Sequence, residues 1–445
     1  MAAPATHESA KDTLIGWDPN DEAYWERTAK PIAWRTLWIT TFCLLLSFCT
    51  WFMVSAIVVK LTGIGYQFDK GQLFWLNSMP GLAAGSLRIV HTFLIPIFGT
   101  RKTVAVSTLL LAVPAVGWGI AVMNPNTSYA TFMLLAFLAG LGGGNFSSFM
   151  PSTSLFFPKK LQGTALGIQA GLGNFGVSVA QFLIPVVIGI AMVGGGQVLT
   201  DDKGARSIYL QNAAFLWVPF VVVGAVVAWF GLKSVPVRAN FREQLDIFRE
   251  KHTWLMTSLY IMTFGSFSGY AAVFPLLIKE TYSKFPGGPD PLAYAFLGPL
   301  LGALLRVLAG PVADRLGGAR VTQVSGIGLL ACAIGATFFM NPTGLESWGG
   351  FLWCMLGLFF FSGIGNASTF KQMPMIFPPR QAGGVIGWTS AIAAYGPFVF
   401  SVLIGATIAR TGSATNFFFG AAVFYAINIA INWWYYTRRG AEKPC

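Results

Sequence analysis

The sequence has few charged residues. They occupy 10% of its 445 positions, whereas a soluble domain carries roughly 25%, and hydrophobic residues make up 54% of the chain. This composition predicts a membrane protein. Residues 1–30 are polar and carry charges of both signs, which is not the pattern of a cleavable signal peptide. We therefore expect the N-terminus to stay in the cytoplasm.

Cysteine and histidine are also scarce. The five cysteines form no CxxC pair, and the three histidines, His7, His91 and His252, are too scattered for a metal cluster. Neither a disulfide framework nor a metal or other cofactor is expected. A membrane-embedded enzyme is excluded as well, because the interior holds no constellation of His, Asp, Glu and Cys.

Long apolar runs, in contrast, are abundant. A spanning helix needs about 20 mainly apolar residues, and twelve runs meet that length, which predicts an all-α membrane protein with twelve transmembrane helices. An even number places both termini on the same side. The predicted spans are 36–59, 72–98, 103–123, 129–151, 163–193, 210–232, 253–279, 291–316, 320–340, 349–371, 383–409 and 414–437.

The basic residues are unequally divided between the two sides of these spans. Of the 29 Lys and Arg residues, 20 lie on the side of the termini, 7 on the other side and two inside spans. Cytoplasmic segments carry such an excess, so both termini are expected in the cytoplasm. The net charge of +12 is then mainly a signal of topology and not of a nucleic-acid surface.

The longest polar stretch between spans is KSVPVRANFREQLDIFREKH at 233–252, and it separates six spans from six. It is interpreted as a linker between two halves. The predicted organisation is a cytoplasmic tail (1–35), a first six-helix half (36–232), the cytoplasmic linker (233–252), a second six-helix half (253–437) and a cytoplasmic tail (438–445).

Two internal repeats support this division. FFPKKLQGTALG at 156–167 aligns with IFPPRQAGGVIG at 376–387, and GSLRIVHTFLIPIFGTRK at 85–102 aligns with ALLRVLAGPVADRLGGAR at 303–320. Two six-helix halves related in this way are the plan of major facilitator transporters, whose substrate site lies between the halves near the bilayer midplane.

Glycines are concentrated in GTALGIQAGLGNFG at 163–176. Gly163, Gly167 and Gly171 recur every fourth residue, so one helix face has almost no side chains. Glycine at this spacing lets membrane helices approach closely, and Asn174 could donate a hydrogen bond where the bare face ends. The glycines predicted to serve packing or gating are Gly163, Gly167, Gly171, Gly173, Gly383 and Gly387.

The two basic residues inside spans are Arg88 and Arg306, and the second repeat aligns them. Each lies about ten residues, or about 15 Å, from the cytoplasmic end of its predicted span, which is near mid-depth. All 17 acidic residues lie in tails, loops or span ends. A buried arginine needs a partner, so a substrate anion is expected to supply the charge, and paired guanidinium donors suit a flat oxyanion.

The chain resembles the NarK-type nitrate/nitrite porter family of the major facilitator superfamily. The resemblance rests on GLGGGNFSSFMPSTSLFFPKKLQGTALGIQAGLGNFGVSVAQFLIP from residue 140, on GNASTFKQMPMIFPPRQAGGVIGWTSAIAAYG in the second half, and on LYIMTFGSFSGY in the seventh span. It covers nearly the whole chain.

This resemblance implies that Arg88 and Arg306 clamp nitrate or nitrite. It further implies aromatic contacts from Phe48, Phe146, Tyr260 and Phe264 and polar contacts from Asn174 and Ser390. His91 follows Arg88 by one helical turn. It could carry a proton, since histidine titrates near neutral pH, or it could simply pack.

The function expected from the resemblance is nitrate and nitrite transport by alternating access in a bacterial cytoplasmic (inner) membrane, as part of nitrate assimilation. An empty site would leave two unpaired positive charges, so each crossing should need an anion, and this favours nitrate:nitrite antiport. Proton-coupled nitrate symport stays open, and an anion channel is the less favoured alternative. Membrane lipid, but no nucleic acid, is an expected partner, and a functional link to a nitrate reductase is left open.

Overall fold

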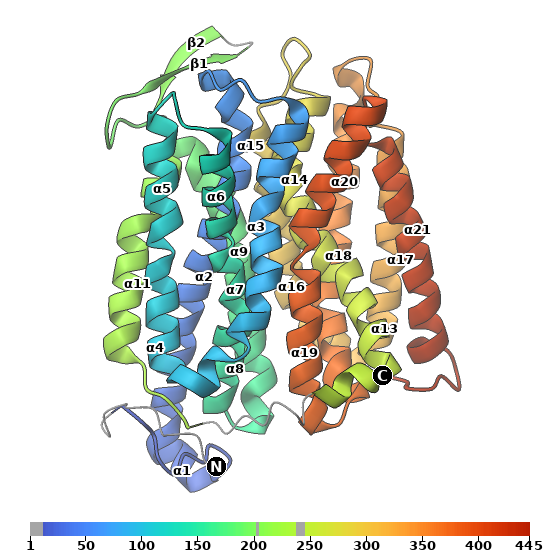
Figure 1. Cartoon of the computed structure of the whole chain (residues 1–445). Coiled ribbons are helices and arrows are strands. Elements are labelled where there is room, and N and C mark those ends of the chain that lie inside the picture. Colours follow the sequence, from blue (N-terminus) through green and yellow to red (C-terminus); the bar gives the residue numbers. More distant parts are fainter. Residues whose placement is uncertain (1–11, 202–203, 237–244) are drawn as a thin grey trace.

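The computed structural model describes residues 12–201, 204–236 and 245–445 as a bundle of long, roughly parallel helices (Figure 1). Both termini of the described chain lie at one end of the bundle, and a small β-hairpin lies at the other. Three parts of the predicted organisation fall outside the described residues: the first eleven residues of the N-terminal tail, Lys203 in a loop, and residues 237–244 of the linker.

Within the described ranges, eleven helices or runs of consecutive helices are long and apolar enough to cross a membrane. Each overlaps one of the predicted spans. The chain forms α1 (Glu22–Tyr24), η1 (Trp25–Ala29), α2 (Lys30–Leu61), η2 (Thr62–Ile64), α3 (Lys70–His91), α4 (Leu94–Leu110), α5 (Ala112–Met123), α6 (Tyr129–Ala139), α7 (Leu141–Gly144), α8 (Phe146–Phe156), α9 (Lys159–Val187), α10 (Asn212–Phe215), α11 (Trp217–Gly231), η3 (Leu245–Arg249), α13 (Lys251–Tyr260), η4 (Ile261–Gly265), α14 (Ser266–Thr281), α15 (Pro291–Tyr294), α16 (Leu297–Leu316), α17 (Gly318–Thr337), η5 (Leu345–Ser347), α18 (Trp348–Ile376), α19 (Pro379–Ala393), α20 (Gly396–Thr411), α21 (Thr415–Asn432) and η6 (Trp433–Thr437).

The second predicted span, 72–98, differs most from the structure. Helix α3 has 22 residues, enough to cross a bilayer, but its polar residues keep it out of the eleven apolar helices. It ends at His91, and α4 begins at Leu94 and bends at Gly99, where φ is 76°. Arg88 is therefore in the last turn of α3. The sequence analysis placed Arg88 at mid-depth by counting about ten residues along a single helix, but that stretch is divided between α3 and α4.

The sequence predicted an all-α protein, but the structure also contains two β-strands. Strands β1 (Gln197–Asp201) and β2 (Gly204–Ile208) form an antiparallel hairpin in which Leu199 pairs with Arg206. Leu199 is buried beside Gly63 of η2, which attaches the hairpin to the helical bundle. At the opposite end of the bundle, the predicted polar tail is helical from Glu22 onward.

The two sequence repeats have the same local backbone. Phe157 and Phe377 end α8 and α18 with nearly equal dihedrals, φ −103° and ψ 142° against φ −107° and ψ 145°. The following prolines precede α9 and α19 in the same extended conformation. Gly99 and Gly317, which the other repeat aligns, both have positive φ, at 76° and 92°. Glycine adopts this conformation readily, so the repeat conserves the turn as well as the residue type.

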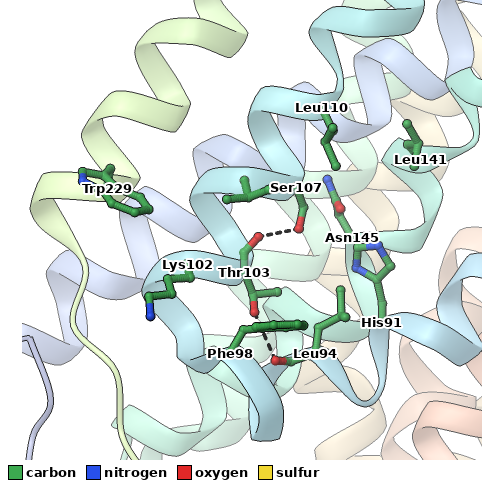
Figure 2. Close-up of a pocket in the computed structure, with 11 residues that line it drawn as sticks. His91, Leu94, Phe98, Lys102, Thr103, Ser107, Leu110, Leu141, Asn145 and Trp229 are labelled. Carbon is green, nitrogen blue, oxygen red and sulfur yellow. Dashed lines mark hydrogen bonds between the residues drawn. The ribbon is translucent and has the colours of Figure 1, made fainter. Parts of the chain in front are cut away.

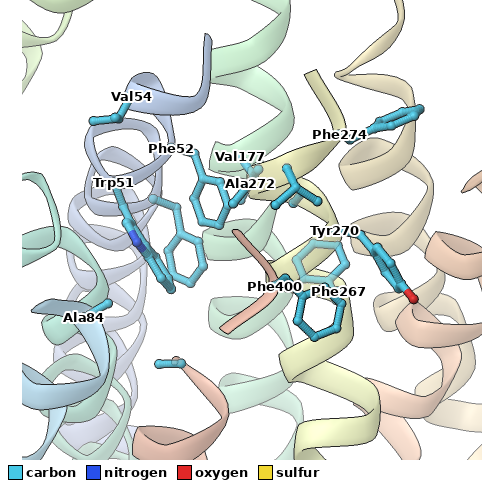
Figure 3. Close-up of a cluster of buried hydrophobic side chains, with 14 of the residues drawn as sticks. Trp51, Phe52, Val54, Ala84, Val177, Phe267, Tyr270, Ala272, Phe274 and Phe400 are labelled. Carbon is cyan, nitrogen blue, oxygen red and sulfur yellow. The ribbon is translucent and has the colours of Figure 1, made fainter. Parts of the chain in front are cut away.

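Large apolar side chains fill the centre of the bundle (Figure 3). They come from helices that are far apart in sequence: Trp51 and Phe52 from α2, Phe267 and Tyr270 from α14, and Phe400 from α20. Tyr270 and Phe400 meet edge to face with ring centroids 4.9 Å apart. This packing ties early and late parts of the chain into one core.

Early and late helices also meet at the end of the bundle that carries the hairpin. Lys60 of α2 lies 3.1 Å from a carboxylate oxygen of Asp290, and Lys70 of α3 lies 2.9 Å from Glu280 of α14. About two turns deeper, Asn77 donates a hydrogen bond of 3.0 Å to the carbonyl of Ala272. These polar contacts join early and late helices at this end of the bundle.

The glycines near the other end contradict part of the packing prediction. A Cβ placed on Gly163, Gly167, Gly383 or Gly387 would meet no atom within 4 Å, so in this structure nothing approaches those positions closely. The prediction holds further along α9: at Gly171 a Cβ would lie 2.5 Å from Val307 of α16, and at Gly173 it would lie 2.8 Å from Leu44.

Candidate functional site

Arg88 is completely buried and is held by backbone carbonyls from two different helices. Its Nε donates to the carbonyl of Gly143 in α7 at 2.9 Å, and its Nη1 donates to the carbonyl of Ser390 in α19 at 2.7 Å. The remaining nitrogen, Nη2, has no hydrogen-bond partner among the described residues. The guanidinium is thus fixed in orientation with one donor group left over.

Arg306 in α16 is 7% exposed, and its Nη1 likewise has no hydrogen-bond partner in the described part of the chain. Asp314, the acidic residue nearest to it in sequence, forms an ion pair with Lys371. Neither Arg306 nor Arg88 pairs with a carboxylate of the described residues. The predicted absence of an internal acidic partner therefore holds across those residues.

A row of aromatic rings connects the two arginines. The Cζ of Arg88 is 4.6 Å from the ring centroid of Phe146 and 5.2 Å from that of Phe264. The ring of Phe264 stacks on that of Tyr260 with centroids 5.5 Å apart, and Tyr260 lies 6.1 Å from Phe370, whose ring is in turn 5.8 Å from the Cζ of Arg306. Phe48 closes the row, with its ring 6.4 Å from Phe146.

Phe264 lies in η4, a single π-helical turn between α13 and α14. Such turns often occur at functional sites because the extra residue redirects the side chains that follow it. Here the turn lies between Tyr260, the last residue of α13, and Phe267 in α14. The structure thus brings together all four predicted aromatic residues, Phe48, Phe146, Tyr260 and Phe264.

Asn174 and Ser390, the predicted polar contacts, are buried in different helices. Both side-chain polar atoms of Asn174 and the hydroxyl of Ser390 have no hydrogen-bond partner among the described residues. Asn174 shares a helix face with Gly171, three residues earlier, and Ser178, four later. Gly171 abuts Val307, and Ser178 donates to Phe296 next to α16, so Asn174 faces the helix that carries Arg306.

His91 does not point toward the aromatic row. Its Nδ1 lies 3.0 Å from the hydroxyl of Ser148 in α8, and its side chain lines a separate cavity of about 380 Å³ beside α4 (Figure 2). His91 is thus only three residues from Arg88 in the sequence, but its side chain faces this separate cavity and not the aromatic row.

The sequence analysis did not single out Asn366, in α18. This residue is completely buried, and both of its side-chain polar atoms are unpaired within the described residues. Three residues before it, Gly363 abuts the backbone of Gly302 in α16, and three residues after it Thr369 bonds Thr263 of η4. Helical geometry thus directs Asn366 between the elements that carry Arg306 and Phe264.

A sequence signal for Asn366 exists in the repeats. GNFSS at 144–148 corresponds to GNAST at 365–369, so Asn366 matches Asn145, which is also fully buried. Phe370, one turn after Asn366, was missed as well, and its ring centroid is 5.8 Å from the Cζ of Arg306.

These side chains form an electropositive site with unused hydrogen-bond donors. The two guanidiniums lie at opposite ends of one aromatic row with no carboxylate of the described residues paired to either, and like charges repel. A buried donor that lacks a partner costs about 1–3 kcal/mol, and more when it is charged. A small anion between the arginines would supply the missing acceptors and offset the repulsion, while the aromatic walls would exclude water.

A family model and individual relatives both match this chain. Residues 40–375 match the family model described as the Major Facilitator Superfamily. A Thermus thermophilus protein named "Probable nitrate/nitrite antiporter NarK2" is 63% identical, over 98% of this chain and 100% of its own length. The Escherichia coli (strain K12) protein named "Nitrate/nitrite transporter NarU" is 38% identical, over 97% of this chain and 98% of its own.

Among solved structures, the chain is similar to a bacterial homologue of the human lysosomal transporter Spinster, with a TM-score of 0.66. The alignment covers 91% of this chain and 96% of that one, at 13% sequence identity. At that identity the likeness concerns the fold alone.

Proposed function

Since this chain belongs to the NarK-type nitrate/nitrite porters of the major facilitator superfamily, we propose that it transports nitrate and nitrite by alternating access, exchanging one for the other. The observation that carries this proposal is the pair of buried guanidiniums, each with an unpaired donor and without a carboxylate partner among the described residues.

We propose twelve membrane helices, α3 included, divided into two six-helix halves by the segment 233–252. The matching backbone at the repeats supports two equivalent halves. The excess of basic residues supports cytoplasmic termini, and the membrane would be the bacterial inner membrane. The end with the hairpin would then face outward.

In this orientation the structure represents a carrier that is closed to the outside. The outer end is held by Lys60 with Asp290 and by Lys70 with Glu280. Gly163 and Gly167 of α9 and Gly383 and Gly387 of α19 have free space at the inner end. We propose that helices of the opposite half approach these four glycines when the inner end closes, as gating glycines would require.

The proposed substrate contacts combine geometry with charge. A trigonal nitrate or bent nitrite can accept charge-assisted hydrogen bonds from the free Nη2 of Arg88 and from Nη1 of Arg306, with its flat faces against Phe146 and Phe264. Asn174 and Ser390 would complete the shell. The amide of Asn174 can donate to an oxygen of the anion, whereas a carboxylate there would compete for the arginines.

Exchange follows from the electrostatics of the empty site. When the site is empty, two guanidiniums without a carboxylate partner among the described residues must pass through the closed intermediate without an anion, so the empty carrier should seldom cross. An anion on each return crossing removes this barrier. The placement of His91 against Ser148, away from the aromatic row, favours exchange over proton-coupled symport.

Uptake of labelled nitrate into proteoliposomes tests the coupling. We expect rapid uptake when the vesicles contain nitrite or nitrate, and at least about a tenfold slower rate when they contain only gluconate, whether or not a pH gradient is imposed. The His91→Gln variant should retain this exchange.

Each alternative predicts a different outcome. Uptake into gluconate-loaded vesicles driven by an inward proton gradient would indicate symport, and loss of that uptake in His91→Gln would assign the proton to His91. Uptake that follows the nitrate gradient without any effect of internal anion would indicate a channel.

Asn366 is proposed as a further substrate contact. Replacing it with alanine should raise the KM for nitrate about tenfold, because a hydrogen bond to a charged group contributes about 1.5–3 kcal/mol. Asn366→Asp should nearly abolish transport, since its carboxylate would occupy the arginines. The matched control is Asn341→Ala, at an exposed asparagine, which should leave the kinetics unchanged. Unchanged kinetics in Asn366→Ala would show that Asn366 does not contact the substrate.

A further inference from the structure

A cavity of about 380 Å³ opens on the side of the bundle, apart from the anion site (Figure 2). Helix α4 forms much of its wall, α11 contributes Trp229, and His91 and Asn145 lie at the deep end. A second cavity of about 250 Å³ adjoins it along the groove between α4 and α11 and shares Val106 and Trp229. Together they form a lateral groove that leads from the outer surface of the bundle to the back of α3.

The lateral groove is lined almost entirely by apolar surface. Its flanks are exposed on the outside of the bundle: Val106 is 49% exposed, Leu110 is 45% exposed and Trp229 is 39% exposed. The polar atoms at the deep end are turned into the protein, where His91 bonds Ser148 and the amide of Asn145 donates to Ser47. In a membrane this surface would meet hydrocarbon and not water.

One end of the lateral groove is basic. Lys102, three residues after the bend at Gly99, is half-buried at the rim, and no carboxylate of the described residues pairs with it. Its neighbour Arg101 is already paired with Asp12 and lies over the ring of Trp229, with its Cζ 4.7 Å from the ring centroid. Arg101 therefore fixes the wall of the groove, and Lys102 keeps its positive charge available.

We propose that the lateral groove binds an anionic phospholipid, with one acyl chain between α4 and α11 and the headgroup phosphate on Lys102. The lateral groove offers the two features that such a molecule needs: apolar walls along both cavities, and Lys102 at the rim of the first. Basic pockets between membrane helices on the cytoplasmic side are suited to anionic headgroups. A free anion would use only the rim and leave the apolar channel unfilled.

The bound lipid would be placed to influence transport without touching the substrate. The deep end of the groove is formed by His91, one helical turn from Arg88 on the same helix. An acyl chain in the groove supports the back of α3 at the turn that carries the arginine. The site is independent of which anion is transported, so its test does not depend on the proposed exchange.

Lipid binding to the purified full-length protein tests the proposal. We expect palmitoyl-oleoyl-phosphatidylglycerol to bind more tightly than phosphatidylcholine with the same chains, measured by retained lipid in native mass spectrometry and by thermal stabilisation. Lys102→Gln should weaken phosphatidylglycerol binding about fivefold, the contribution of one lysine at an anionic surface. Lys159→Gln, which removes an exposed charge at the start of α9, should leave it unchanged.

A second pair of variants tests the apolar channel. Val106→Trp places a large ring in the shared wall of both cavities and should remove the tightly bound lipid, whereas Val113→Trp, on exposed α5 surface outside the groove, should retain it. Equal affinity for the two lipids, or full phosphatidylglycerol preference in Lys102→Gln, would overturn the proposal. Equal stabilisation by inorganic phosphate alone would show a site for a free anion instead.

Discussion

Replacing either Arg88 or Arg306 with lysine should reduce nitrate/nitrite exchange by roughly 100-fold. Lysine keeps the charge but offers no paired, planar donors, so about 3 kcal/mol from charge-assisted hydrogen bonds to the anion would be lost. Arg88 would lose more than substrate contacts, because its Nε and Nη1 also bond the carbonyls of Gly143 and Ser390. Initial rates of counterflow in proteoliposomes would measure the effect.

Arg315→Lys is the matched control for this experiment. Arg315 lies on α16, the helix of Arg306, but at its exposed end. It should exchange nitrate for nitrite at the wild-type rate. The clamp would be refuted by a variant of Arg88 or Arg306 that folds and keeps normal exchange kinetics.

Gly363→Ala should destabilise the protein by about 1–3 kcal/mol, the usual cost of an overpacked interior. The added Cβ would meet the backbone of Gly302, including its Cα at 2.8 Å, and backbone cannot move aside as a flexible side chain can. Relief would require α16 and α18 to separate, which would displace Arg306. Thermal unfolding in detergent and the yield of monodisperse protein would report the loss.

Gly167→Ala provides the contrasting variant. A Cβ on Gly167 would meet no atom within 4 Å, and alanine is favoured over glycine in a helix by about 1 kcal/mol. Its thermal stability should therefore be equal to or above that of the wild type. Comparable destabilisation of the two variants would mean that helix contacts do not decide which glycines are required.

Local sequence features predicted the spans and most of the aromatic row. Uninterrupted apolar runs located the long helices, and the four-residue spacing of Tyr260 and Phe264 placed both rings on one face. The acid-free interior around Arg88 and Arg306 could be inferred because a buried charge without a partner is costly and therefore informative.

Features that depend on contacts between distant helices were missed. The apolar run through residues 92–98 was interpreted as a continuation of the second span, yet α3 ends at His91 and the chain turns before Gly99. The spacing of Gly163 and Gly167 predicted a close neighbour, but a Cβ there would meet no atom within 4 Å, because spacing along one helix does not show where a second helix lies. Asn366 was overlooked although GNAST at 365–369 matches GNFSS at 144–148, because the sequence around one amide does not show which distant helix its side chain faces.

Equilibrium binding of nitrate to the purified protein tests most directly whether two unpaired arginines form one anion site. Titration calorimetry should give one nitrate per chain for the wild type, with nitrite competing for the same site, and no measurable binding for Arg88→Lys or Arg306→Lys. Binding of wild-type strength in either variant, or the absence of nitrate binding in the wild type, would contradict the account.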